Sequence, residues 1–125
     1  MKPTVFPALL ALAALAACGS SYSPNSAPPP PPAPGSTTVQ LLSSGGNRFS
    51  QAVLTVASGT TVRFEWVGGT HNVTSNGSPS FSSSGAPTAA PHTYDVTFTT
   101  PGSYNYFCSV HGTATTGMRG TIVVQ

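Results

Sequence analysis

The chain has 125 residues and a formal net charge of +2, from four Lys or Arg and two Asp or Glu. Charged residues are 5% of the sequence, against about 25% in ordinary soluble domains. This composition offers no basic stripe for binding nucleic acid. Two carboxylates also cannot supply both a cage for a hard cation and a catalytic carboxylate pair. The length suits one small folded domain.

Residues 1–17 are predicted to be an export signal. An uncharged apolar run from Ala8 to Ala17 follows Lys2. Ten residues make about 15 Å of helix, which is too short for a bilayer core of about 30 Å but typical of a secretory signal. The sequence Leu15-Ala16-Ala17-Cys18 resembles the cleavage motif of bacterial lipoproteins. The resemblance implies cleavage before Cys18 and lipidation of its thiol; an ordinary signal with a chance cysteine is the alternative.

Residues 18–37 are predicted to form the lipidated cysteine and a proline-rich tether. Pro28 to Pro32 are consecutive, and Pro34 follows. Consecutive prolines favour an extended polyproline II helix because each ring fixes φ and removes a backbone donor. At about 3.1 Å per residue this segment reaches roughly 60 Å. We therefore expect an exported protein that is lipid-anchored to a bacterial membrane and faces the periplasm or the cell exterior. A ligand for proline-recognising modules is the less favoured interpretation.

Residues 38–125 are predicted to form an all-β Greek-key sandwich of about seven to eight strands. Apolar and polar residues alternate in 60–67, 94–99 and 104–108, as in half-buried strands. Shorter strands are expected at 39–42, 53–56 and 71–74, and a last strand at 120–125. Residues 75–91 are predicted to be a long loop with one short edge strand near Phe81. The expected core is Phe49, Leu54, Val56, Val62, Phe64, Trp66, Val96, Phe98, Tyr104, Tyr106, Ile122 and Val124.

Cys108 is the centre of the predicted chemistry. Two cysteines in an exported chain first suggest a disulfide, but an acylated Cys18 would have no thiol to offer. A lone thiol in an oxidising compartment is a liability unless it is buried or ligated. We therefore expect Cys108 to bind a metal, with the disulfide as the alternative.

Three further residues complete a soft donor set. His111 follows Cys108 by three positions, Met118 follows His111 by seven, and His71 lies on an earlier strand. A plane of two imidazoles and a thiolate with a weak axial thioether is the arrangement of a blue-copper site. We expect Cys108 to end an inward-facing strand, His111 and Met118 to lie on the following loop, and His71 to come from a neighbouring strand at the same end. The sequence thus predicts one copper ion.

The segments VLTVASGTTVRFEWVGGTHNV, VTFTTPGSYNYFCSVHG and GMRGTIVV occur in an order that resembles cupredoxins of the plastocyanin and pseudoazurin type. The resemblance covers most of residues 47–125. It implies the same fold, the ligands His71, Cys108, His111 and Met118, and a supporting hydrogen bond from Asn72 near the thiolate. One departure is the six residues between His111 and Met118, where plastocyanin-like loops commonly have four.

The resemblance also implies how partners are recognised. Redox proteins are expected to dock on an uncharged patch around His111, framed by Gly112, Ala114, Gly117 and Pro79. The third histidine, His92, matches no ligand position and is expected to be a solvated or edge-strand histidine.

The expected function is that of a one-electron carrier, a monomer that is not an enzyme. A copper carrier or storage protein is the alternative. A fragment of a multicopper oxidase or nitrite reductase is disfavoured because the sequence has no His-x-His pair. A metal-free adhesion sandwich would leave the Cys–His–Met grouping as coincidence, and a Cys–His hydrolase would lack a group to orient the histidine.

Overall fold

The fold is that of a computed structural model, which describes residues 35–125. The predicted export signal, Cys18 and the tether as far as residue 34 lie outside the described residues. Within the described part the chain forms ten strands and no helix. The strands are β1 (Ser36–Leu42), β2 (Arg48–Phe49), β3 (Val53–Val56), β4 (Thr60–Trp66), β5 (Thr70–His71), β6 (Thr74–Asn76), β7 (Thr88–Ala89), β8 (His92–Phe98), β9 (Gly102–Gly112) and β10 (Gly117–Val124).

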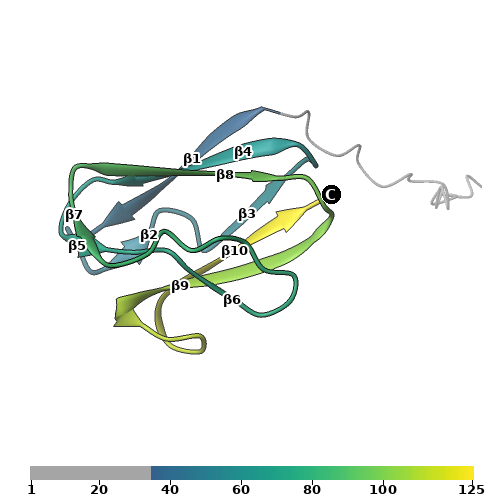
Figure 1. The fold of residues 1–125 in the computed structure, drawn as a ribbon. Helices are drawn as coiled ribbons and strands as arrows, with labels where there is room; N and C mark the ends of the chain where they lie inside the picture. The colour runs from purple at the N-terminus through teal and green to yellow at the C-terminus, as the bar shows by residue number, and fades with distance from the viewer. Residues whose placement is uncertain (1–34) are drawn as a thin grey trace, which may run out of the picture.

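Two four-stranded sheets face each other across the core (Figure 1). The strand order is β2-β1-β4-β8 in one sheet and β3-β10-β9-β6 in the other, and β5 pairs with β7 in a separate two-stranded sheet. β1 runs parallel to β4, and β3 runs parallel to β10, so neighbours in space are distant in sequence. Such crossovers between sheets are what a Greek-key sandwich requires. The predicted fold class is confirmed.

Alternation along β4 shows how the sequence builds the core. Val62, Phe64 and Trp66 are buried, whereas Arg63 between them is exposed. The core aromatic rings meet edge to face, with centroids 5.3 Å apart for Phe64 and Tyr106. The buried apolar cluster is Val39, Leu41, Phe49, Val56, Val62, Phe64, Trp66, Val73, Phe98, Tyr104, Tyr106, Cys108, Met118, Ile122 and Val124.

The predicted core needs adjustment at the sheet edges and on β1. Leu54 on β3 and Val96 on β8, both edge strands, are only partly buried. Val39 and Leu41 are fully buried, because β1 is flanked by β2 and β4. β1 also begins at Ser36 rather than at the predicted residue 39.

The predicted strand at 71–74 is wrong in its bounds. The chain forms β5 and β6 instead, and Asn72 and Val73 lie between them. Both residues are buried, so consecutive side chains turn inward where a regular strand would alternate them. This interruption separates His71 on β5 from the strand that pairs with β9.

The predicted edge strand near Phe81 is also wrong. Serine hydroxyls take the backbone donors that a sheet partner would otherwise satisfy: Phe81 N donates to Ser75 Oγ, and Ser75 N donates to Ser83 Oγ. The Phe81 ring instead packs on the core, 5.3 Å from the Phe98 ring centroid. The loop thus closes one side of the sandwich through a side chain rather than through backbone pairing.

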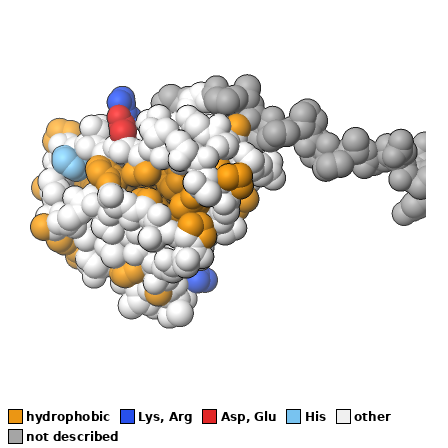
Figure 2. Space-filling view, turned by 45° about the vertical axis from the view of Figure 1, so that its right-hand side comes forward, with side chains coloured by type: hydrophobic (Ala, Val, Ile, Leu, Met, Phe, Trp, Pro, Cys, Tyr) orange, Lys and Arg blue, Asp and Glu red, His pale blue; other side chains and the backbone are white. Residues whose placement is uncertain are grey.

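The surface carries few charges. Figure 2 shows mostly white polar groups and orange apolar groups, with little blue or red. Arg63 and Asp95 form an exposed ion pair of 2.9 Å across β4 and β8. No helix within residues 35–125 has the length and apolar character needed to cross a membrane.

Candidate metal centre

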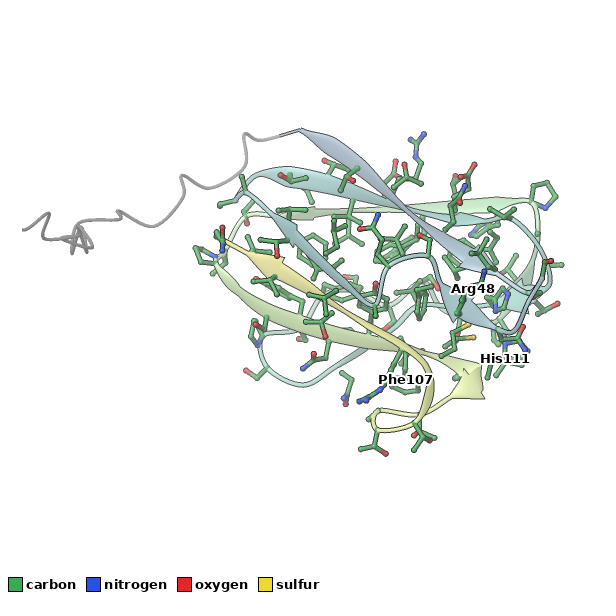
Figure 3. All side chains as sticks on the ribbon, turned by 180° about the vertical axis from the view of Figure 1, so that it is seen from behind. Arg48, Phe107 and His111 are labelled. Atoms are coloured by element: carbon green, nitrogen blue, oxygen red, sulfur yellow. The ribbon has the colours of Figure 1, made fainter. Side chains whose placement is uncertain are left out.

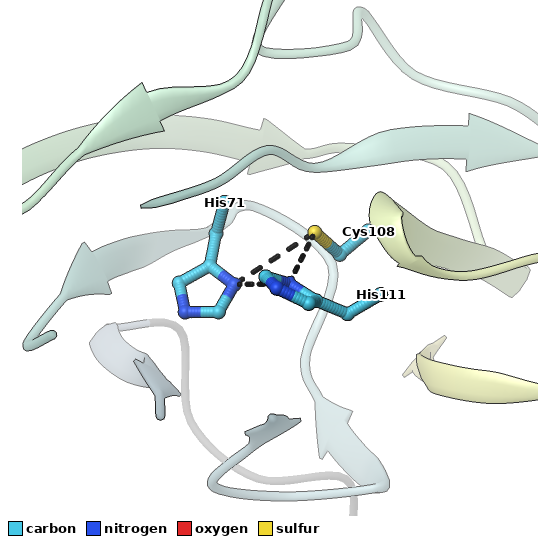
Figure 4. A group of neighbouring side chains, drawn as sticks. All are labelled: His71, Cys108 and His111. Atoms are coloured by element: carbon cyan, nitrogen blue, oxygen red, sulfur yellow. Dashed lines mark hydrogen bonds between the residues drawn. The ribbon is translucent and has the colours of Figure 1, made fainter. Parts of the chain in front are cut away.

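Three predicted ligands converge at one end of the sandwich (Figure 4). Cys108 Sγ lies 3.8 Å from His71 Nδ1 and 3.7 Å from His111 Nδ1, and the two Nδ1 atoms are 3.2 Å apart. His71 and Cys108 are fully buried, and His111 is partly exposed. The side chains come from β5 and β9, which belong to different sheets.

These distances fit a single metal ion. Nitrogen and sulfur ligands of a borderline-soft ion lie about 2.0–2.3 Å from it, so three donors in a plane around one ion would be roughly 3.4–4.0 Å apart. The observed separations of 3.2–3.8 Å are close to this range. Two imidazoles and a thiolate are the donor set of blue-copper sites. The residues present therefore fit copper.

A bulge in the β9–β10 hairpin positions two of these ligands, Cys108 and His111. Phe107 pairs with Arg119 and Gly112 pairs with Gly117, so the four residues 108–111 of β9 face only Met118 of β10. The extra residues on one strand bend it and re-aim its side chains. Cys108 and His111 consequently point to the same side, although regular β alternation would place them on opposite faces. Figure 3 shows His111 at the end of the sandwich from which the hairpin projects.

The predicted loop between His111 and Met118 is part of this hairpin. His111 lies within β9 and Met118 within β10. The prediction that both residues lie on a loop is therefore wrong. Gly112 and Gly117 cross closely: a Cβ on Gly112 would lie 2.6 Å from Met118 N, and Gly117 has a φ of +74°. Met118 is 1% exposed and directly opposes the ligand-bearing bulge.

A polar cradle fixes the ring of His71. His71 Nε2 lies 2.9 Å from Gly68 O and 3.0 Å from Ser43 Oγ, while Ser43 Oγ donates to Gly68 O at 3.1 Å. A carbonyl oxygen can only accept, so the proton of the neutral imidazole is on Nε2 and Nδ1 keeps its lone pair. Outer contacts of this kind set the tautomer and raise the basicity of a ligating nitrogen. Gly69 borders the cradle, and a Cβ there would lie 3.1 Å from His71 Nε2.

Burial is the main cause that lowers the pKa of His71 below its ordinary value. The hydrogen bond to Gly68 O acts in the opposite direction, and the neighbouring His111 adds to the lowering. The charged imidazolium loses hydration when it is enclosed, so the neutral ring is favoured. A neutral ring is also the form that binds a metal.

Asn72 ties the β5 segment to the bulge. Its Oδ1 accepts a hydrogen bond from Ser109 N at 2.8 Å, and its Nδ2 donates to Ser109 Oγ at 2.9 Å and to Gly85 O at 3.1 Å. Ser109 directly follows Cys108, so these bonds hold the backbone next to the thiolate. The family resemblance implied a supporting role for Asn72 near the thiolate, and its hydrogen bonds in the structure go to Ser109 and Gly85.

Two other contacts concern residues that flank the site. Trp66 Nε1 donates to His71 O at 2.8 Å and so anchors the ligand's backbone. His92 is exposed on β8, an edge strand, and lies outside the ligand group, as predicted. Its ring meets Trp66 edge to face with centroids 4.9 Å apart.

The sequence missed Ser43, and it misplaced Pro79. No motif marked Ser43, because its contact with His71 spans 28 positions and arises only from the fold. Pro79 lies against Gly102 at the start of β9, whereas the ligands lie toward its end. Pro79 therefore does not frame a patch around His111.

The sequence model for copper-binding proteins of the plastocyanin/azurin family matches residues 37–125. The chain belongs to this family. Solved structures agree with the assignment. A pseudoazurin from Sinorhizobium is 29% identical and superposes with a TM-score of 0.57 over 73% of this chain and 74% of that one. The family accounts for the donor set that His71 forms with Cys108 and His111 of the hairpin, and the cofactor of this cupredoxin is copper.

Other structural relatives differ in size. A purple cupredoxin from Nitrosopumilus maritimus shares the fold at 21% identity, with a TM-score of 0.58 over 71% of this chain and 99% of that one. A copper-containing nitrite reductase from Thermus scotoductus is 32% identical, with a TM-score of 0.56 over 75% of this chain. The match spans only 23% of the reductase chain. The family fold thus occurs both alone and as part of a larger enzyme.

Proposed function

We propose that this cupredoxin is a one-electron carrier rather than an enzyme. The observation that carries the proposal is the enclosure of the donor group: His71 and Cys108 are fully buried, and only His111 reaches the surface in part. Copper held by such donors supplies a one-electron couple. The surrounding residues exclude water and fix the ligand positions, which favours electron transfer with little rearrangement over binding of a substrate.

Met118 is proposed as the axial ligand. It is buried among core side chains, and its backbone lies against Gly112 next to the bulge that carries Cys108 and His111. A thioether is a weak, soft donor that suits copper. Removing it should favour Cu(I), because Cu(II) gains more from an additional electron donor.

Redox partners are proposed to dock where His111 reaches the surface. Val110 next to it is 48% exposed, and Val67 near the His71 end of β4 is 54% exposed. The described residues contain few charges, so long-range attraction would contribute little to docking. We propose a monomer whose transfer rate changes little with ionic strength.

Anchoring through Cys18 is proposed on the sequence alone. The protein would be exported, lipidated at this residue and held off a bacterial membrane by the proline-rich tether. Mass spectrometry of the N-terminal peptide tests the modification, and Cys18→Ala should move the protein from the membrane to the soluble fraction. Equal membrane association of both forms would contradict the anchor.

Copper titration tests the function directly. Adding Cu(II) to the purified protein should produce an intense visible band from thiolate-to-copper charge transfer, and Cys108→Ala should abolish it. Met118→Leu should keep the band and raise the reduction potential. A colourless wild-type complex would overturn the electron-transfer proposal, and an unchanged potential in Met118→Leu would remove Met118 from the site.

A further inference from the structure

Trp66 links the ligand His71 to a second surface of the molecule. It is the single tryptophan in the chain. On one side its Nε1 donates to His71 O at 2.8 Å. On the other side the indole ring meets the ring of His92, with centroids 4.9 Å apart and an interplanar angle of 82°. The side chains of His92 and Trp66 and the backbone of His71 thus form a continuous series of contacts from an exposed residue to a metal ligand.

This series opens at a different place from His111. His92 is the first residue of β8, which forms the edge of the β2-β1-β4-β8 sheet, and it pairs with Trp66 in the register of β8 and β4. His111 lies on β9, in the opposite sheet. His92 is an exposed residue, whereas Trp66 is 2% exposed. The buried indole ring of Trp66 therefore connects the surface at His92 with the ligand His71.

The contacts have the properties that electronic coupling requires. Tunnelling decays more steeply across a non-bonded gap than through covalent bonds or a short hydrogen bond. The Trp66–His71 hydrogen bond has an ordinary short N···O distance, and the edge-to-face geometry of Trp66 and His92 is a favoured aromatic contact. From the His71 carbonyl, a short covalent path leads to Nδ1, the atom that faces Cys108.

We propose that Trp66 provides a second electron-transfer route between the copper site and a one-electron donor, a reduced redox protein that docks at His92. The inference rests on the proposed one-electron function. One electron leaves the donor, which is oxidised by one unit, and reduces Cu(II) to Cu(I); no bond breaks and no proton moves. With His111 as the other opening, one partner can reduce the protein while a second contacts a different surface.

The three histidines make a direct test possible. His71 and His111 are occupied in the copper-loaded protein, so His92 is the remaining histidine for attachment of a photoactive ruthenium complex. After a laser flash, loss of the blue band reports electron transfer from ruthenium to copper. Trp66→Phe keeps an aromatic ring but removes the N–H donor, and it should slow this transfer several-fold.

Phe49→Leu is the matched control. Phe49 is also a buried core aromatic, but its ring contacts Tyr106 rather than Trp66. This variant should transfer at the wild-type rate once any change in potential is taken into account. Equal rates in wild type and Trp66→Phe, with unchanged band and potential, would overturn the route. A protein without the blue band would instead refute the proposed function itself.

Moving the label tests the route without altering the core. In His92→Gln combined with Thr93→His, the label shifts by one residue and points to the other face of β8. Thr93 pairs with Glu65 and not with Trp66, so transfer from the new position should be slower. An equal or faster rate would overturn the proposal.

A copper-free measurement examines the hydrogen bond itself. Trp66 is the single tryptophan in the sequence, so it gives the only indole N–H signal in the proton NMR spectrum. In the copper-free protein, the Trp66 indole N–H should exchange with deuterated solvent much more slowly than the indole N–H of free tryptophan. Exchange as fast as in free tryptophan would show that the link to His71 is absent and would overturn the route.

Discussion

Replacing Asn72 with alanine should weaken both the fold and the copper site. The residue is 4% exposed, and its side chain hydrogen-bonds to three partner atoms, Ser109 N, Ser109 Oγ and Gly85 O. A typical intramolecular hydrogen bond contributes about 0.5–1.5 kcal/mol net, so the loss of the three should cost roughly 2–4 kcal/mol. Because two of these bonds hold the residue after Cys108, copper affinity should also fall.

Urea denaturation of the copper-free protein measures the first effect, and competition for copper with a chelator of known affinity measures the second. Asn105→Ala is the matched control, since Asn105 is exposed on β9 and its side chain accepts one bond, from Thr121 Oγ1. Surface changes of that kind usually cost less than about 0.5 kcal/mol. If Asn72→Ala costs no more than Asn105→Ala, the reasoning about the bulge is wrong.

Two further changes test the electrostatics. Ser43→Ala should raise the reduction potential, because His71 Nε2 loses a polar neighbour and Nδ1 becomes a less basic ligand. A less basic ligand stabilises Cu(II) less. A redox titration that finds an unchanged or lower potential would refute this. The hydrogen bond from Arg63 lowers the pKa of Asp95 from 3.8, so the folded state gains stability above that value and loses it as the pH falls. In thermal melts between about pH 4 and 2, Asp95→Asn should therefore lose slightly less stability than the wild type as the pH falls. A larger loss than in the wild type would show that the ion pair with Arg63 does not lower the pKa of Asp95.

The ligands were predictable because their chemistry is rare in this sequence. The folded part holds one cysteine and three histidines, and the close spacing of Cys108 and His111 restricts their relative position. The family resemblance supported His71, which was expected on a neighbouring strand at the same end of the sandwich. All three donors do converge there.

The surroundings of the ligands were less accessible to sequence reasoning. Ser43 is one of many serines, and it reaches His71 only because β1 runs parallel to β4, which brings the ends of both strands together. The inward turn of Asn72 and Val73 breaks the alternation on which strand prediction depends. The predicted strand near Phe81 does not form because serine hydroxyls accept the backbone hydrogen bonds there. Composition alone does not reveal such bonds.

The long spacing between His111 and Met118 is accommodated by the hairpin rather than by the site. Gly112 pairs with Gly117, and the intervening turn is closed by its own bonds, from Thr113 N to Thr116 O at 2.8 Å and from Thr116 N to Thr113 Oγ1 at 3.2 Å. The additional residues therefore lie beyond the glycine pair, on the side away from the bulge. The pairs Phe107–Arg119 and Gly112–Gly117 also place Met118 opposite residues 108–111, so the position of Met118 relative to Cys108 depends on the base of the hairpin and not on the length of its tip. The six-residue spacing is thus compatible with an axial Met118.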